Sequence, residues 1–299
     1  MIIDFHTHTF PGQLSGKVVR KLGHLARISP FTDGSLDALL ASMKHAGVEY
    51  SVTLPVMTHS GQVEKINTSV IQHREDFLRQ GILAFGGIHP DYPDYRRELR
   101  RLRENHIPGI KLHPAYQNVD LDDLRMMRII DCATEEGLIV LCHAGIDIGI
   151  YDHNYCSVAH ILNVLKEVGP QNLVLAHMGN WAMWQDVERD LAGAPVWLDT
   201  AFSLGPVTAN PDVHEPPYRE MNLTNRDFLR LVHKHGVDRI LFATDSPWQD
   251  QADYIRRIKA LGDDGNIRVV LLKALGLSLA EEKQLFSHNA RQLLGTIPA

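Results

Sequence analysis

Short, β-branched apolar segments alternate with amphipathic segments along almost the whole chain, and this alternation restricts the possible folds more than any other feature. Eight apolar segments have the length of strands: residues 2–8, 49–54, 82–88, 109–113, 138–143, 173–177, 196–199 and 239–245. Strands that alternate regularly with helices are typical of a parallel sheet in an α/β protein. Eight such units favour a (β/α)8 TIM-like barrel over an open, doubly wound sheet.

The segments between these strands place their apolar residues on one face of a helix. They comprise residues 36–45, 62–79, 95–105, 122–136, 157–168, 183–191, 226–235 and 250–260. Two further helices, near residues 267–275 and 279–294, are expected to pack outside the barrel as additional C-terminal helices. No change in composition and no Ser/Gly-rich linker divides the sequence, so we expect residues 1–299 to form a single domain.

Three of the segments that follow strands are long, namely residues 9–35, 144–156 and 200–224. In a barrel these segments lie at the carboxyl ends of the strands, where catalytic sites form. Because a long loop inside a compact domain is usually functional or disordered, we predict that these three are loops that shape a site. The third segment contains four prolines that would stiffen it: Pro206, Pro211, Pro216 and Pro217.

The charge balance and the apolar runs exclude several classes of partner. The 30 Lys and Arg residues face 36 Asp and Glu, and this net charge of −6 argues against binding to nucleic acid or to an anionic membrane. No apolar run approaches the roughly 20 residues that span a bilayer, and residues 1–10 lack the pattern of a signal peptide. We therefore expect a cytoplasmic protein with a small-molecule substrate, for which a homodimer would be ordinary. The three cysteines have neither disulfide nor zinc-site spacing and are expected to be buried thiols.

The first strand carries two histidines, His6 and His8, that alternate with Ile3, Phe5 and Thr7. Because successive side chains of a strand point to opposite faces, the two imidazoles are predicted to lie side by side in the barrel mouth, with the other three side chains on the opposite face. Neutral imidazole is the commonest protein ligand of divalent metals. Two histidines alone would equally suit a surface or core position, so the other strands decide between these interpretations.

Three further residues whose side chains could bind a metal or transfer a proton end apolar strands. His143 and His177 each end such a strand, are each followed two residues later by glycine, and lie 34 residues apart, which is about one strand–helix unit. They should therefore occupy equivalent heights on neighbouring strands, the fifth and the sixth. Asp245 ends the eighth strand, which lies beside the first strand in a closed barrel. Its carboxylate should therefore approach His6 and His8.

With this arrangement the sequence resembles the amidohydrolase superfamily, specifically amidohydrolase family 2, which includes metal-dependent hydrolases and decarboxylases like the aminocarboxymuconate-semialdehyde enzyme. The matching motifs run in order along the chain: residues 4–8 (DFHTH), 109–114 (GIKLHP), 141–145 (LCHAG), 176–179 (AHMG), 243–248 (ATDSPW) and 287–294 (SHNARQLL). The resemblance implies a distorted (β/α)8 barrel with one or two metal ions in its mouth. It makes His6, His8, His143 and Asp245 the ligands of a divalent ion, with Zn favoured and Mn or Fe as alternatives.

The resemblance also implies roles for His177 and Lys111. In single-metal members the position of His177 polarises the substrate or moves a proton. In members with two ions the same position helps to hold the second ion, which is bridged by a carboxylated lysine or a glutamate, and Lys111 at the end of the fourth strand is the candidate for that bridge. Lys111 suits equally well an ordinary ammonium group that binds a substrate anion. His113 and His89, which end the fourth and third strands, fit either a substrate contact or a structural role.

We therefore expect a metal-dependent hydrolase that acts on a small amide, ester or lactone through a metal-activated water. Asp245 would take the proton from that water and return it to the leaving group, while His177 would polarise the carbonyl. The alternative is nonoxidative decarboxylation of a small aromatic or muconic-type acid, which needs a cationic carboxylate clamp, with Lys111, Arg27 and Arg219 as candidates. A barrel that only binds a metal or a ligand would show no turnover.

Overall fold

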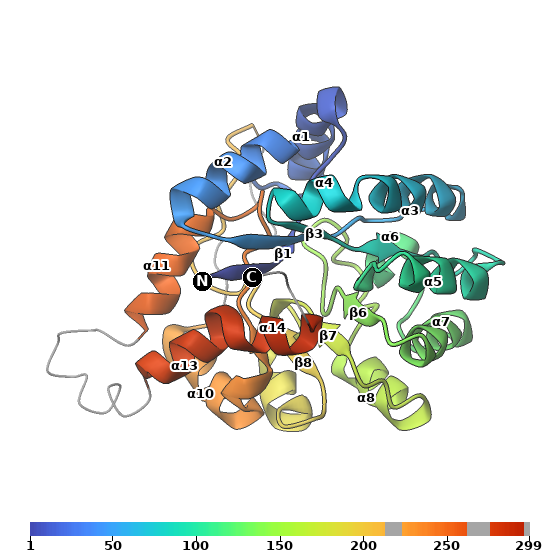
Figure 1. Cartoon of the computed structure of the whole chain (residues 1–299). Coiled ribbons are helices and arrows are strands. Elements are labelled where there is room, and N and C mark those ends of the chain that lie inside the picture. Colours follow the sequence, from blue (N-terminus) through green and yellow to red (C-terminus); the bar gives the residue numbers. More distant parts are fainter. Residues whose placement is uncertain (213–222, 262–275, 296–299) are drawn as a thin grey trace, which may run out of the picture.

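The computed structural model describes residues 1–212, 223–261 and 276–295, and its strands form a parallel barrel surrounded by helices (Figure 1). The strands are β1 (Ile3–Thr7), β2 (Tyr50–Thr53), β3 (Ile82–Ala84), β4 (Gly86–Gly87), β5 (Gly109–Leu112), β6 (Ile139–Cys142), β7 (Leu173–Leu175), β8 (Trp197–Asp199) and β9 (Ile240–Leu241). They pair in parallel in the order β1-β2-β3 and β4-β5-β6-β7-β8-β9. The predicted α/β barrel is confirmed.

Backbone hydrogen bonds between the last and the first strand close the barrel. Phe5 donates its N–H to the carbonyl of Phe242 over 2.8 Å, and the N–H of Asp245 donates to the carbonyl of His6 over 2.8 Å. The N–H of His8 donates to Ser246 over 2.7 Å. This seam lies where the sequence places the eighth strand beside the first, so Asp245 reaches the histidines through the pairing of the strands themselves.

The third predicted strand, residues 82–88, is divided at Phe85 into β3 and β4. β3 pairs with β2, β4 pairs with β5, and Phe85 between them donates its N–H to the carbonyl of Thr53 over 3.0 Å. Beyond this point the side-chain amide of Asn67 replaces β2 as a partner, since it accepts from the N–H of Gly87 and donates to its carbonyl, both over 3.0 Å. Gly86 lacks a Cβ that would lie 2.7 Å from Leu102, which allows the helix layer to approach this strand.

The helices follow the predicted order around the barrel (Figure 1). They are α2 (Leu36–Ala46), α3 (Val63–Gln72), α4 (Arg74–Arg79), α5 (Tyr95–Glu104), α6 (Pro114–Gln117), α7 (Leu124–Glu135), α8 (Val158–Glu167), α9 (Trp184–Asp186), α10 (Asn225–His235), α11 (Gln251–Ala260), α13 (Leu279–Lys283) and α14 (Asn289–Leu294). The predicted helix 62–79 is broken at His73, and the helix 183–191 is a short α9 followed by one π-helical segment. The predicted helix near 267–275 lies outside the described residues.

The segment 9–35, predicted to be a loop, contains a helix of three turns, α1 (Ser15–Ala26). The prediction was wrong here because Gly12, Gly16 and Gly23 lower helix propensity and obscure a regular apolar row at Leu14, Val18, Leu22 and Ala26. The segments 144–156 and 200–212 contain no helix, as predicted, whereas the rest of the third loop, residues 213–222, lies outside the described residues.

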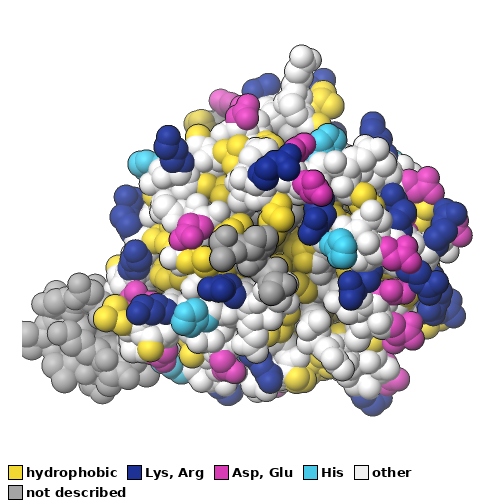
Figure 2. Space-filling view, viewed as in Figure 1, with side chains coloured by type: hydrophobic (Ala, Val, Ile, Leu, Met, Phe, Trp, Pro, Cys, Tyr) yellow, Lys and Arg dark blue, Asp and Glu magenta, His cyan; other side chains and the backbone are white. Residues whose placement is uncertain are grey.

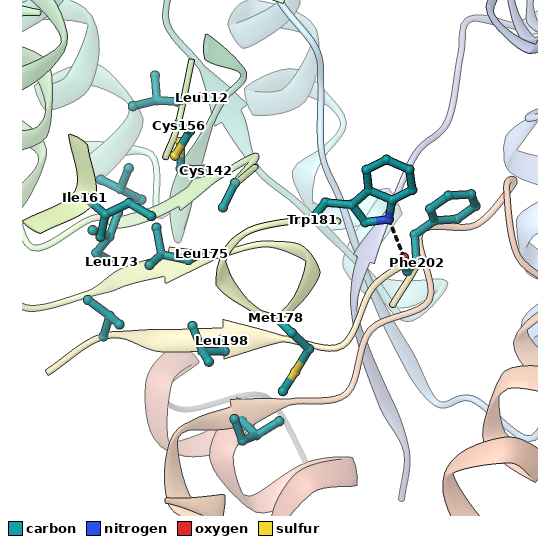
Figure 3. Close-up of a cluster of buried hydrophobic side chains, with 14 of the residues drawn as sticks. Leu112, Cys142, Cys156, Ile161, Leu173, Leu175, Met178, Trp181, Leu198 and Phe202 are labelled. Atoms are coloured by element: carbon teal, nitrogen blue, oxygen red, sulfur yellow. Dashed lines mark hydrogen bonds between the residues drawn. The ribbon is translucent and has the colours of Figure 1, made fainter. Parts of the chain in front are cut away.

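Two layers of buried apolar side chains lie on the inner and outer sides of the strands. The inner cluster consists of side chains from the strands and their ends, together with Ala290 of α14. Figure 1 shows α14 across the barrel end at which the amino terminus lies, so this helix covers the amino end. The outer cluster packs the strands against the helices, and Figure 3 shows part of it, with Cys142 and Cys156 among leucines of neighbouring strands. All three cysteines are buried free thiols, as predicted.

The alternation of β1 differs from the prediction. The pairing of β1 with β2 shifts register between Asp4 and Thr7. As a result, Phe5 packs in the inner cluster, where its ring meets Phe85 edge-on at 6.1 Å, although His6 and His8 also point into the mouth. A bulge that adds a residue to one strand changes which face the following side chains occupy. Strict alternation of the five residues therefore does not hold.

Charged side chains of both signs are interspersed over the face drawn in Figure 2. Within the described residues, no helix combines the length and the apolar character that crossing a bilayer requires.

Candidate metal centre

Three of the predicted ligands meet at the carboxyl end of the barrel. The Nε2 atoms of His6 and His8 lie 3.1 Å apart, and Oδ1 of Asp245 lies 3.7 Å from the first and 3.2 Å from the second. All three side chains are buried, and their ligand atoms lie within 4.8 Å of one another. Strand β1 supplies His6, the position just after it supplies His8, and the chain after β9 supplies the carboxylate.

The outer nitrogens of these imidazoles determine their tautomers. Nδ1 of His6 donates to Oδ2 of Asp199 over 2.8 Å, and Nδ1 of His8 donates to the carbonyl of Leu54 over 2.8 Å. The carbonyl of Leu54 only accepts, and so does Asp199 in its carboxylate form. In that form the proton of each ring lies on Nδ1 and each Nε2 carries a lone pair. Two lone pairs that face each other at 3.1 Å repel unless a cation lies near both. The donor set therefore fits a divalent ion.

The surroundings of His6 favour its neutral form. Burial, together with the nearby charge of Lys111, holds the pKa of His6 well below its usual range, so its ring is neutral at pH 7. Nζ of Lys111 lies 3.4 Å from Nε2 of His6 and donates toward it. Burial also lowers the pKa of Lys111 itself.

His143 and His177 form a relay of hydrogen bonds that ends on an unpartnered nitrogen. Nδ1 of His177 donates to the carbonyl of Ala201 over 2.9 Å, so Nε2 of His177 accepts, and Nδ1 of His143 donates to it over 3.0 Å. The proton of His143 is therefore on Nδ1. Its Nε2 carries a lone pair, is fully buried and has no hydrogen-bond partner. A buried acceptor without a partner is costly in free energy, so this atom also fits a ligand position.

A second group of potential ligands contains His113, His143 and Asp147, whose ligand atoms also lie within 4.8 Å of one another. The rings of His113 and His143 are stacked at 4.3 Å, with 14° between their planes. Nδ1 of His113 accepts from the N–H of Tyr116 over 3.4 Å, which places its proton on Nε2, 3.6 Å from Oδ2 of Asp147. His113 is therefore a hydrogen-bond donor toward this site, and the lone pair in the group belongs to His143.

The structure places the predicted site residues in two adjoining groups. His6, His8 and Asp245 form one group, whereas His143 belongs to the second and is not within 4.8 Å of every member of the first. Both ring nitrogens of His177 already have partners, so its bond to His143 must break before it contacts a substrate.

The two remaining histidines that end strands differ in their placement. His113 lines the cavity of the site. His89 is buried outside that lining and accepts from the N–H of Asp91 over 3.2 Å, which fits the structural alternative.

Asp199 and Asp147 were missed by the sequence reasoning. Asp199 bonds His6 and also accepts from the N–H groups of His177 and Ala201 over 2.9 and 3.0 Å. Burial raises the pKa of Asp199 to about 7, although the Lys111 charge and the two N–H donors act in the opposite direction. Its position after the apolar strand 196–199, which matches that of Asp245, was the available signal. Asp147 lies within a loop, where the sequence carried no comparable signal.

Gly145, two residues after His143, allows two segments at the mouth of the barrel to lie close together. A Cβ on Gly145 would lie 2.0 Å from the backbone nitrogen of Trp181, so only glycine allows the segments after β6 and β7 to pair there. His177 and Asp245 themselves have left-handed φ angles of 59° and 68°. Non-glycine residues in this region of φ cluster at functional sites, where the surrounding structure compensates for the strain.

The two groups of ligands lie in one large cavity of about 1030 Å3. Lys111, Tyr116 and Asp147 contribute to its polar lining. Trp181 and Phe202 form part of its apolar wall, and Figure 3 shows them side by side, with the indole N–H of Trp181 donating to the carbonyl of Phe202 over 3.0 Å. A buried polar centre within an apolar cavity is the usual form of a small-molecule site.

A TIM-type barrel with imidazole and carboxylate ligands converging at the carboxyl ends of its strands defines the class of metal-dependent barrel enzymes. The chain belongs to the amidohydrolase family, whose model, described as Amidohydrolase, matches residues 3–296. It is therefore an enzyme of the amidohydrolase superfamily, with a site suited to a divalent metal. None of the curated proteins compared with the chain matches it.

Several solved structures share the fold. An uncharacterised TIM-barrel protein from Bordetella bronchiseptica is 18% identical, covers 99% of both chains and has a TM-score of 0.69. A dihydroxybenzoic acid decarboxylase from Polaromonas sp. JS666, with bound manganese and the inhibitor 2-nitroresorcinol, is 14% identical, with coverages of 100% and 98% and a TM-score of 0.65. A 2-pyrone-4,6-dicarboxylic acid hydrolase from Pseudomonas putida, described as putative, is 16% identical, with coverages of 98% and 97% and a TM-score of 0.59. At these identities the likeness concerns the fold.

Proposed function

We propose that the protein is a metal-dependent hydrolase of a small-molecule amide, ester or lactone. The observation that carries this proposal is the pair of Nε2 lone pairs of His6 and His8, which face each other 3.1 Å apart beside the carboxylate of Asp245. His143, whose unpartnered Nε2 belongs to the adjoining group, is the fourth proposed ligand, and the two groups would have to draw together to share one ion. A divalent ion held there, with Zn favoured and Mn or Fe as alternatives, would supply Lewis acidity and lower the pKa of a water molecule.

Asp245 acts as the general base and then as the general acid in this proposal. Its carboxylate lies 3.2 Å from Nε2 of His8 and is partly accessible from the cavity, so it is placed to accept a proton from the attacking water. After the tetrahedral intermediate forms, the same group returns the proton to the leaving oxygen or nitrogen. Asp199 holds the ring of His6 in the tautomer that leaves Nε2 free, which makes it a positioning residue.

Lys111 supplies positive charge to the substrate oxygen. Its ammonium group is buried at the end of β5 and donates toward His6, which is the behaviour of an N–H donor. The same group can donate to a carbonyl oxygen that becomes negatively charged in the transition state. A carboxylated Lys111 would instead bridge two ions, so the number of ions per chain distinguishes these two forms. His177 contributes by holding the tautomer of His143.

The test is turnover by metal-depleted protein before and after addition of Zn, Mn or Fe, measured as acid release from a panel of esters, lactones and amides. We expect no turnover without metal and recovery with at least one of the three ions. Elemental analysis of the active protein gives the number of ions. Failure of every ion to restore hydrolysis would contradict the proposal.

Nonoxidative decarboxylation at the same centre is the second candidate, and the buried Lys111 favours it as one cationic contact for a substrate carboxylate. The other proposed clamp residues offer less, since Arg27 is not among the residues that line the cavity and Arg219 lies outside the described residues. Release of carbon dioxide from aromatic or muconic-type acids, without hydrolysis of the ester panel, would favour this candidate.

A further inference from the structure

The cavity that contains the metal centre is larger than a small amide or ester requires. Its volume of about 1030 Å3 lies at the upper end of the roughly 300–1,000 Å3 that is typical of small-molecule sites. Its lining extends beyond the ligand groups to side chains of α1, α3 and α4. The question is therefore which part of a substrate occupies it.

One wall of this space is a row formed by Leu14, which immediately precedes α1, and by side chains of α1. Leu14, Val18, Leu22 and Ala26 all line the cavity, and their spacing of four residues places them on one face of the helix. Twelve residues of helix span about 18 Å. Along the row the exposed fraction rises from 6% at Ala26 to 57% at Leu14, with Val18 and Leu22 half-buried between them. An elongated apolar face thus leads from the protein interior to the solvent.

A second apolar row from another part of the chain lines the same cavity. Ile66 and Val70 of α3 and Phe77 of α4 are all half-buried, although they are large and apolar. Each of these side chains packs partly against the outer cluster and also lines the cavity with apolar surface. Apolar surface of this kind on two walls marks a site for an apolar ligand group.

The α1 wall is held in place by contacts at the end of the helix. Gly23 approaches so closely that a Cβ there would lie 2.7 Å from the carbonyl of Ile28 and 3.6 Å from the ring of Trp248. The N–H of Ser29 donates to Thr208 over 2.8 Å, and that of Phe31 donates to Pro247 over 2.8 Å. These bonds fix α1 to the segments that follow β8 and β9, so the space exists before a ligand binds.

The charges that line the cavity do not favour a second anionic group. Among the described lining residues, the lysines are Lys65 and Lys111, the acids are Asp37, Asp147 and Asp245, and there is no arginine. Of these two lysines, Lys65 lies beside the α3 wall and is exposed, so a second carboxylate on a substrate would lose hydration among apolar side chains and gain one exposed partner. An uncharged hydrocarbon group meets no such cost.

We propose that this space is a binding arm for a linear hydrocarbon tail, and that the substrate is a monoester or lactone whose carbonyl lies at the metal centre. The hydrolytic part of this inference rests on the function proposed above. The apolar arm is defined by six side chains: Leu14, Val18, Leu22, Ile66, Val70 and Phe77.

The first test measures binding without turnover. Calorimetric titration with straight-chain alcohols from propan-1-ol to octan-1-ol should show a Kd that falls about threefold for each added methylene group. Val18→Trp, which fills the arm, should abolish this dependence, whereas Lys21→Trp, on the exposed face of the same helix, should retain it. Val70→Trp and the exposed control Gln72→Trp repeat the test on the opposite wall if α1 does not tolerate the first change.

A Kd that does not depend on chain length, or equal loss in the arm variants and their controls, would overturn the proposal. The second test compares kcat/KM for acetate, butyrate, hexanoate and octanoate esters, and for an octanoate analogue with a terminal carboxylate. We expect a steady rise with chain length and at least about a tenfold loss with the terminal charge. If the alcohols bind as expected but no ester is hydrolysed, the proposed function fails and the arm remains. If esters are hydrolysed without preference for length, the arm fails and the function remains.

Discussion

The two faces of the seam between β1 and β9 use the same short stretches of chain in opposite ways. On the outer face, both carboxylate oxygens of Asp4 have partners: Oδ1 accepts from the N–H groups of His6 and Thr244 over 3.2 and 3.0 Å, and Oδ2 accepts from Oγ1 of Thr244 and Nε2 of Gln251 over 2.5 and 2.7 Å. On the inner face, His6, His8 and Asp245 direct acceptor atoms at one another.

The difference shows how a buried polar group reveals its use. Asp4 receives all its hydrogen bonds from the chain, which is what a buried group needs when its purpose is to hold two strands together. The inner imidazoles have close partners on their outer atoms, Nδ1 of His6 and of His8, whereas at the inner nitrogens the chain offers one donor, the ammonium group of Lys111, 3.4 Å from Nε2 of His6. Their remaining coordination is left for a ligand. Asp4 and Asp245 therefore lie on opposite faces of the same seam. The first has a structural role, and the second is available for chemistry.

The largest effect is expected on the inner face. His6→Ala removes one of the converging lone pairs, and we expect it to lower metal content and to reduce kcat/KM about 1000-fold, which corresponds to about 4 kcal/mol. Elemental analysis and kinetics on the same preparation measure both quantities. Because the change also removes the partner of the buried Oδ2 of Asp199, we expect a moderate fall in melting temperature, with the variant still folded. A variant that retains full activity after chelation would remove His6 from the site.

A change on the outer face should lower the free energy of unfolding and leave metal binding unchanged. Asp4→Asn replaces an acceptor oxygen by a donor next to Thr244 and Gln251, so we expect the free energy of unfolding to fall by about 3 kcal/mol. Urea denaturation measures this change, and the metal content of the folded variant should equal that of the wild type. Loss of metal with unchanged stability would erase the contrast between the two faces.

His177 combines features of a structural group and of a ligand. It lines the cavity, but both of its ring nitrogens have partners. His177→Asn should leave the metal bound and reduce kcat about 30-fold, since residues that orient ligands typically contribute a factor of 10 to 100. Metal analysis beside steady-state kinetics separates the two outcomes. Loss of the ion would place His177 among the ligands instead.

The smallest effect is expected at His235, a buried histidine that is not among the residues lining the cavity. Its Nδ1 accepts from the N–H of Gly193 over 3.2 Å, and its Nε2 donates to the carbonyl of Val196 over 3.0 Å. Burial lowers the pKa of His235, so the folded state favours the neutral ring. Its contribution to stability is therefore present above the unfolded pKa of about 6.5 and is lost as the pH falls below that value.

His235→Gln keeps both types of hydrogen bond and removes the titration. We expect the variant to lose less stability than the wild type between pH 7.5 and pH 5, as measured by urea denaturation at each pH. An identical pH dependence in the two proteins would show that a histidine with two partners does not contribute to acid sensitivity here.

Much of the site could be predicted because strand ends are marked locally. His6, His8, His143, His177 and Asp245 each follow an apolar run, and the barrel brings such ends to one face. Their detailed arrangement could not be predicted, since the bulge in β1 changes its alternation and the tautomers depend on partners elsewhere in the chain. The helix α1 was missed because its glycines lower the helix signal, although contacts with other segments stabilise it.

By itself, the sequence determined the order of strands and helices and the residues that end the strands. Apolar periodicity and the residues that end an apolar run are properties of neighbouring positions in the chain. Only the tertiary structure decided which nitrogen of each imidazole is free. Asp199 fixes His6 from 193 positions away, and the carbonyl of Leu54 fixes His8 from another strand. Hydrogen bonds between distant segments are directional and short, so they exist only once packing has brought the partners together.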